Sequence, residues 1–186
     1  TEDLAGEMDR RFYLEMDEDL RIQLKIKRDV EKRGRSKEFT LSEIARRSGD
    51  AKKYIHPQAS RAHVLFSLIP ANPKLLMENS EKIKLKLRVK LIHGGYYEDL
   101  MRCLIGICGL NININDIDNR GGVDLDIQGE VIGEDILLAS RMLLPNLDEM
   151  IDFEGGFRDG MLGVMQLIAI VEINEALMLR RRMANG

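Results

Sequence analysis

The sequence is poor in cysteine and aromatic residues, and both shortages limit what the protein can be. Only two cysteines occur among 186 residues, Cys103 and Cys108, and their spacing matches no metal-binding or redox motif. We therefore expect two reduced cytosolic thiols and no disulfide scaffold. No cluster of Asp, His or Cys has metal-ligand spacing either, so we expect no metal site in this chain. Aromatic residues make up 5% of the chain and do not alternate with its cations, which argues against nucleic-acid binding.

Long uninterrupted hydrophobic runs are also missing, and there is no signal-peptide pattern. The most apolar segment, residues 161–179, is interrupted by four polar side chains, Gln166, Glu172, Asn174 and Glu175. A buried core helix explains that segment better than a membrane span. The chain is 44% hydrophobic and 32% charged, with both signs spread along its length. This composition predicts a soluble, cytoplasmic globular protein of one large domain or two small ones.

The first third of the chain predicts strands flanking helices. Residues 11–15 are typical of a short strand. Asp17 is positioned to cap a helix that ends near Arg33, before Gly34. Five residues at helical spacing form the apolar side of that helix: Leu20, Ile22, Leu24, Ile26 and Val30.

A second, shorter helix and a second strand are expected before a linker. Thr40 and Glu43 have the spacing of a capping box, which predicts a helix that ends near Gly49. Residues 62–69 alternate as a strand. Pro70 begins the linker. If these strands belong to a parallel sheet, the first part should be ordered only by partnering with an N-terminal fragment, a second copy, or residues 77–186.

The second half predicts an antiparallel sheet with helices. Residues 82–91 alternate strictly between apolar residues and the cations Lys82, Lys84, Lys86, Arg88 and Lys90. We interpret this row as a solvated face, although it could also meet a phosphorylated ligand. Further helices are expected at residues 96–108, 134–144 and 161–183, and two strands flank a turn at residues 118–122.

Positive charge is concentrated on the first expected helix, although the net charge of the chain is -3. Arg21, Lys25, Arg28 and Lys32 are four, three and four residues apart, which places them on one ridge. A solvated helix face, a phosphate clamp and a nucleic-acid contact could each explain such a ridge. The negative net charge makes nucleic acid the weakest of the three.

The same region carries an ordered set of motifs, "KIKRDVEKRGRS" followed by "EIARRSGDAKKYIHPQASRAHVLF". This set resembles the phosphoribulokinase/uridine kinase family, and within it phosphoribulokinase, over about residues 11–70. The segments at residues 87–95 and 152–177 look similar to the C-terminal region of that family, mostly in hydrophobic pattern.

The resemblance implies a lid that closes over ATP, Mg and a sugar phosphate, with ribulose 5-phosphate as the family's substrate. It implies that Lys25, Arg28 and Arg33 are lid cations that contact the transferring phosphoryl group, and that Asp29 holds them in place. We expect Arg21, Arg46 and Arg47 to bind substrate phosphate. Phosphoryl transfer depends mostly on positioning and on neutralising charge, so cations of this kind suit it.

The sequence has no match to the P-loop pattern G-x-x-x-x-G-K-[ST]. Gly155 and Gly160 have the glycine spacing, but Met161 and Leu162 stand where Lys and Ser or Thr are needed. We interpret "EGGFRDG" as a glycine turn before the last helix, with an anion site at that helix N-terminus as the weaker alternative. We therefore expect the chain to start after the catalytic half and not to transfer phosphate alone.

These observations predict an α/β protein in two parts. Residues 1–76 would be the lid helices and closing strands of a partial P-loop kinase. Residues 77–186 would be an α+β module with a mostly antiparallel sheet and a long buried helix. The predicted function is the C-terminal part of an ATP-dependent sugar-phosphate kinase, which would bind nucleotide and sugar phosphate in the complete protein. The alternative is a non-catalytic module for oligomerisation or regulation, and a homo-oligomer is expected in either case.

Overall fold

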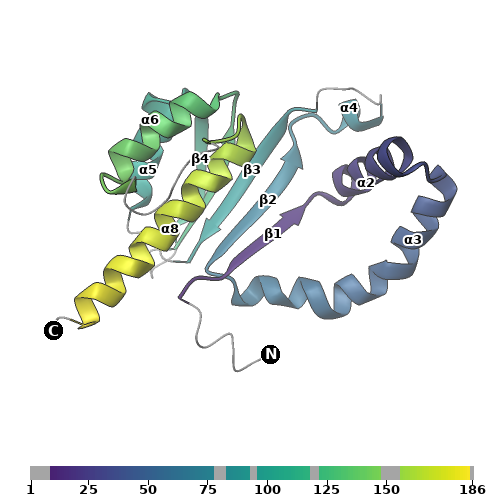
Figure 1. The fold of residues 1–186 in the computed structure, drawn as a ribbon, viewed down its shortest axis with the longest axis horizontal. Coiled ribbons are helices and arrows are strands. Elements are labelled where there is room, and N and C mark those ends of the chain that lie inside the picture. Colours follow the sequence, from purple (N-terminus) through teal and green to yellow (C-terminus); the bar gives the residue numbers. More distant parts are fainter. Residues whose placement is uncertain (1–8, 78–82, 93–95, 118–121, 148–155, 185–186) are drawn as a thin grey trace.

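The computed structural model describes residues 9–77, 83–92, 96–117, 122–147 and 156–184. Its centre is one five-stranded mixed sheet with the strand order β1-β2-β3-β5-β4 (Figure 1). The strands are β1 (Phe12–Met16), β2 (Val64–Pro70), β3 (Leu85–Leu91), β4 (Asn111–Ile117) and β5 (Val123–Gln128). β1 and β2 are parallel, and all other neighbours are antiparallel. The predicted mixed α/β class is therefore confirmed.

Alternation along the strands separates a buried face from a polar face. Leu87, Val89 and Leu91 of β3 are at most 1% exposed, and they share one face with Leu125 and Ile127 of β5. Helices α5 (Tyr97–Gly106), α6 (Gly133–Leu143) and α8 (Met161–Ala184) contribute to the same apolar core. These helices therefore cover one face of the sheet, and the Lys and Arg side chains of β3 lie on the other.

The sheet runs across the boundary between the two expected parts. β2 pairs with β3 along its whole length, from Val64 opposite Leu91 to Pro70 opposite Leu85. This pairing buries Val64 and Phe66 of the first part in the common core. β1 pairs with β2 alone among the described strands, and Phe12 and Leu14 remain 39% and 57% exposed. The first part is thus joined to the second by a continuous sheet, and β1 forms its outer edge.

The first predicted helix is present as α2 (Glu18–Arg33). The Asp17 side chain caps it by accepting from the Leu20 backbone N–H at 3.1 Å, and Gly34 ends it with a left-handed φ of 61°. Its apolar side is less buried than expected, because Leu20 is fully buried while Leu24 and Val30 are about 40% exposed. The buried residues of α2 are Leu20 in its first turn and Asp29 in its last turns.

The second helix begins earlier than the capping box predicted. Helix α3 spans Lys37–Asp50, and its N-cap is Ser36, whose hydroxyl accepts from the Phe39 N–H at 3.1 Å. Thr40 lies inside the helix, where its hydroxyl donates to the Ser36 carbonyl. The prediction of a cap at Thr40 was wrong because the turn at Gly34 places Ser36 directly before a helical segment. The chain then continues through the π-helical turn η1 (Ala51–Ile55), the 3-10 helix η2 (His56–Arg61) and, after β2, α4 (Lys74–Met77).

The last helix, α8, is long and apolar enough by length and composition to cross a membrane, with a mean hydropathy of 1.7 over its most apolar window. The sequence predicted no segment that could span a membrane, and α8 corrects that prediction in its length and composition. The core helix of a soluble protein meets the same criteria, and α8 packs Val164, Leu167, Ile168 and Val171 into the core beside the sheet. The helix also buries a carboxylate, Glu172.

Candidate phosphate-binding site

A pocket of about 610 Å³ lies between α2 and α3 and holds most of the predicted phosphate-binding cations. Arg21 and Lys25 line it from α2, and Arg46 and Arg47 line it from α3. Asp50 is the single carboxylate in its lining, and Ile44, Ser48, Ala51 and Ile55 complete it. The two helices form a hairpin around the turn at Gly34, and this turn brings cations that are more than 20 residues apart to one place. The pocket therefore has an excess of positive charge.

Arg21 is held in place by a carboxylate of its own helix. Its Nε lies 2.8 Å from Glu18 Oε2, and its terminal nitrogen lies 2.6 Å from Oε1, so the contact is bidentate. The hydrogen bond from Arg21 lowers the pKa of Glu18, and the same contact raises the pKa of Arg21. Glu18 therefore fixes the direction in which the guanidinium points without removing it from the pocket.

Glu43 does the same for the two arginines of α3. Its Oε2 lies 2.8 Å from Arg46 and 3.9 Å from Arg47. The hydrogen bond from Arg46 lowers the pKa of Glu43, and the charges of Arg46, Arg47 and Lys25 add to this effect. Both arginine side chains are more than two thirds exposed, so the contact is screened by solvent and is weak. An incoming anion can therefore compete for them.

A second group of charges surrounds Asp29, whose side chain is 1% exposed. Arg28 contacts its Oδ1 at 2.9 Å, Arg33 the same oxygen at 3.2 Å, and Arg35 its Oδ2 at 3.9 Å. The hydrogen bond from Arg28 is the main cause of a lowered pKa for Asp29, and the nearby charges of Arg33 and Arg35 contribute. One carboxylate thus faces three guanidiniums, each about half exposed, and two positive charges are in excess.

The predicted site residues consequently fall into two groups. Lys25 lies in the pocket with Arg21, Arg46 and Arg47, while Arg28, Asp29 and Arg33 form the group around the buried carboxylate. Arg35, which was not predicted from the sequence, joins the second group. Gly34 was the sequence signal for this contact. A residue with left-handed backbone angles at a helix end turns the chain, and with it the next residue, back toward the helix.

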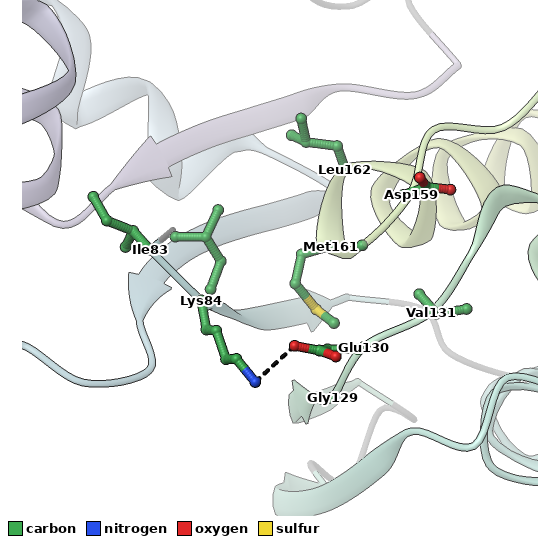
Figure 2. Close-up of a pocket in the computed structure, with 10 residues that line it drawn as sticks. Ile83, Lys84, Gly129, Glu130, Val131, Asp159, Met161 and Leu162 are labelled. Atoms are coloured by element: carbon green, nitrogen blue, oxygen red, sulfur yellow. Dashed lines mark ion pairs between the residues drawn. The ribbon is translucent and has the colours of Figure 1, made fainter. Parts of the chain in front are cut away.

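A different pocket, of about 360 Å³, lies at the start of α8 beside the "EGGFRDG" segment. Figure 2 shows Lys84 directed at Glu130, with which it forms an ion pair of 2.6 Å, and Asp159 and Met161 on the side of α8. Asp159 accepts a hydrogen bond from the Gly133 N–H at 2.7 Å. Two carboxylates and one lysine line this pocket, so an anion at the helix N-terminus is disfavoured. The part of the segment that the structure describes is a turn, with φ of 62° at Gly156 and 69° at Gly160.

The described part of the chain contains no group of three or more His, Cys, Asp or Glu side chains that could hold a metal ion. Glu18 and Glu43, beside the cationic pocket, are each engaged by arginine, and Asp50 is the one carboxylate in the pocket lining. Cys103 and Cys108 are free thiols, and burial raises the pKa of Cys108 to about 11. The pocket lining, among the described residues, is therefore mainly cationic.

Comparison with known proteins bears on the part of the chain that carries this pocket. Residues 1–74 match the model of the Phosphoribulokinase / Uridine kinase family. The resemblance is therefore confirmed for this part. It indicates a kinase-like origin for β1, α2, α3 and β2. The similarity expected for residues 87–95 and 152–177 lies outside the matched range and stays a prediction.

Two curated relatives agree with the family match. The chain is 34% identical over 85 residues to a phosphoribulokinase of Synechocystis sp., which is 46% of this chain and 24% of that protein. It is 34% identical over 89 residues to a chloroplastic phosphoribulokinase of Chlamydomonas reinhardtii, which is 48% of this chain and 22% of that protein. The chain thus spans about a quarter of the length of the curated relatives it matches.

Proposed function

We propose that residues 1–74 form the lid and closing strands of an ATP-dependent sugar-phosphate kinase. The observation that carries this proposal is the gathering of Arg21, Lys25, Arg46 and Arg47 around one open pocket between α2 and α3. The family match supports it, because it covers both helices of the pocket. In the complete protein this pocket would hold phosphate groups of the nucleotide or of the sugar phosphate.

The arrangement suits phosphoryl transfer, in which charge spreads over the oxygens of the moving group. Arg offers several donors in a plane, and Lys a mobile point charge. Glu18 and Glu43 contact Arg21 and Arg46 through exposed, weak ion pairs, so a phosphate could compete for these donors. Its negative charge would offset the excess positive charge of the pocket.

The group around Asp29 would supply the lid cations closest to the reaction. Arg28 and Arg33 keep their guanidiniums half exposed while Asp29 anchors one side of each. Lys25 belongs to the pocket and would act from there. In this proposal Asp29 contacts no substrate, and its role is to hold the arginines in position.

ATP fits this site only through its phosphates. The cationic pocket can contact a polyphosphate, whereas the P-loop is absent from the sequence, and Glu18 and Glu43 beside the pocket are engaged by arginine. Mg would neutralise charge on the phosphates, and apart from Asp50 its ligands would come from elsewhere in the complete protein. The outer edge of β1, with Phe12 and Leu14 exposed, is where further strands of a kinase core could pair. The names of the relatives suggest ribulose 5-phosphate as the sugar phosphate.

The experiment is calorimetric titration of the chain with inorganic pyrophosphate at low ionic strength. We expect binding that weakens at least tenfold in a variant with Arg46→Ala and Arg47→Ala, and that weakens with added salt. Arg102→Ala is the matched control, because Arg102 is an exposed arginine on α5 that is likewise paired with helix carboxylates. Equal affinity in the wild type and the double variant would contradict the proposal.

The alternative is a non-catalytic module for oligomerisation or regulation, as a homo-oligomer of this chain. The observation in its favour is that β1 and β4 are edge strands of the described sheet. Edge strands present unpaired backbone groups that can pair with another chain. Light scattering at micromolar concentration distinguishes the two proposals when combined with the titration. A dimer that binds no pyrophosphate would favour the module, and a pyrophosphate-binding chain would favour the lid.

A further inference from the structure

A buried carboxylate on α8 joins three segments that are far apart in the sequence. Glu172 has a side chain that is 3% exposed, and its Oε2 lies 2.7 Å from Nε of Arg10. Its other oxygen, Oε1, accepts a hydrogen bond from the Tyr96 hydroxyl. Arg10 precedes β1, and Tyr96 is the residue before α5. Both oxygens of Glu172 are therefore engaged, by partners 162 and 76 residues away.

The place of this carboxylate in α8 is unusual. The other buried residues of the helix are apolar or glycine, with Asn174 as the one further polar side chain. Burial of a charge is costly, and a buried ion pair often contributes less to stability than an apolar replacement. Loss of either partner of such a pair leaves an unpaired charge in the interior, which is strongly destabilising. The contact therefore specifies where the start of β1 lies on α8.

A second contact strengthens this connection. Asp9 Oδ1 lies 2.6 Å from Nε of Arg180, about two turns further along α8. Burial of the Tyr96 side chain and the negative charge of Glu172 raise the pKa of the Tyr96 hydroxyl, so that it remains a donor. Two successive residues before β1 are thus attached to one helix.

β1 leads directly from this attachment to the cationic pocket. Its last residue is followed by Asp17, whose N–H donates to the Leu68 carbonyl at 2.9 Å and whose side chain caps α2. Figure 1 shows α8 near the start of β1 and α2 at its far end, with the strand running between them. β1, which pairs with β2 along its length, thus connects the Arg10 contact on α8 to the first turn of α2.

We propose that Glu172 is a positioning residue that ties α8 to the cationic pocket through Arg10 and β1. The proposal rests on the proposed function in one respect only, namely that the pocket binds a phosphate-bearing ligand. Glu172 itself touches no ligand. Its role is to hold the start of β1 so that α2 presents Arg21 and Lys25 toward α3.

The first measurement is amide hydrogen exchange on the full chain, with Glu172→Gln compared with wild type. We expect at least tenfold faster exchange in β1 and in the first turn of α2, while β5, which lies two strands away from β2, changes less than twofold. The reversed pair, Arg10→Glu with Glu172→Arg, should recover part of the protection. Equal acceleration in β1 and β5, or none in β1, would overturn the proposal. If Glu172→Gln does not fold, Tyr96→Phe can be used instead, because it removes only one hydrogen bond. It should accelerate exchange in the same segments by about threefold.

The second measurement is the affinity for inorganic pyrophosphate. We expect Glu172→Gln to weaken it about fivefold although Glu172 lies at the opposite end of β1, and Arg102→Ala to leave it unchanged. If wild type binds pyrophosphate and the Glu172→Gln chain binds equally well, Glu172 does not position the pocket. If wild type binds no pyrophosphate, the proposed function fails, and the exchange pattern alone decides whether Glu172 holds β1.

Discussion

Arg35 reaches back over the end of α2 to Asp29, six residues earlier. Its backbone N–H donates to the Asp29 carbonyl at 3.0 Å, and its guanidinium lies 3.9 Å from the Asp29 carboxylate. This return depends on Gly34, which has a φ of 61°. The helix end and the charge group are therefore one structural unit, and changes to either should affect the other.

Gly34→Ala tests that dependence. A Cβ at Gly34 meets no atom within 4 Å, so the change introduces backbone strain without a clash. Because L-residues in the left-handed region are disfavoured, we expect the free energy of unfolding to fall by about 1 kcal/mol. Gly49→Ala is the matched control, since Gly49 also has open space but lies within helix α3 with a negative φ. Gly49→Ala should raise the free energy of unfolding by about 0.5–1 kcal/mol. If urea unfolding shows that both variants are stabilised or that both are destabilised, the left-handed conformation assigned to Gly34 is contradicted.

Asp29→Asn should change how stability depends on pH. The Arg28 hydrogen bond lowers the pKa of Asp29 in the folded protein, so the folded state favours the ionised form. The stabilisation is therefore complete above the unfolded pKa of about 3.9 and is lost as the pH falls through the lower folded value. We expect the variant to be less stable than wild type at pH 7, and the difference to shrink below about pH 4. Urea unfolding from pH 7 to pH 2.5 measures the stability difference between the variant and wild type. If that difference grows on acidification, the pKa of Asp29 is not lowered in the folded protein.

Arg28→Gln and Arg33→Gln test the lid cations in the complete kinase. Each removes one charge and leaves two arginines around Asp29, so the fold should be retained. Loss of one contact to the transferring group typically costs on the order of a hundredfold in rate. We expect that loss in kcat, with thermal unfolding within a few degrees of wild type. Normal turnover in either variant would remove that arginine from the mechanism.

Gly163→Ala tests the packing of α8 against α6. A Cβ at Gly163 would lie 1.8 Å from the Arg158 carbonyl oxygen and 2.6 Å from Cδ1 of Ile136, so the backbone of the preceding turn must move. We expect a loss of about 2–3 kcal/mol in the free energy of unfolding. Gly106→Ala, at the end of α5 with no neighbour within 4 Å, should change stability by less than 1 kcal/mol. If Gly163→Ala leaves the free energy of unfolding unchanged, α8 can shift away from α6.

The sequence predicted the elements whose signals are local. The Asp17 cap, the Gly34 stop and the alternation of β3 each depend on residues within a few positions of one another, and all three are present. The Ser36 cap was missed because Thr40 and Glu43 offer a competing signal of the same kind four residues later. Local patterns alone do not decide between two such caps, because the turn before the helix determines which one is used.

The site was predictable in its residues and not in its arrangement. The cationic ridge identified Arg21, and the family resemblance included Arg46 and Arg47, yet their common pocket depends on how α2 and α3 turn about Gly34. The contact between Arg10 and Glu172 spans 162 residues, and no spacing rule connects them. Contacts of this kind arise from the sheet order, because β1 lies beside β2 and β2 beside β3. The sequence offered no signal for that order beyond the strands themselves.

The most direct test of the lid assignment is a residue-resolved titration of the isotope-labelled chain with inorganic pyrophosphate, followed by NMR. We predict saturable shifts of the amides of α2 and α3, strongest near Arg21, Lys25, Arg46 and Arg47, which diminish as salt is added. The pocket at the start of α8, with Glu130 and Asp159, should show no saturable shift. Absence of shifts in α2 and α3, or saturation only at residues of α8, would contradict the account.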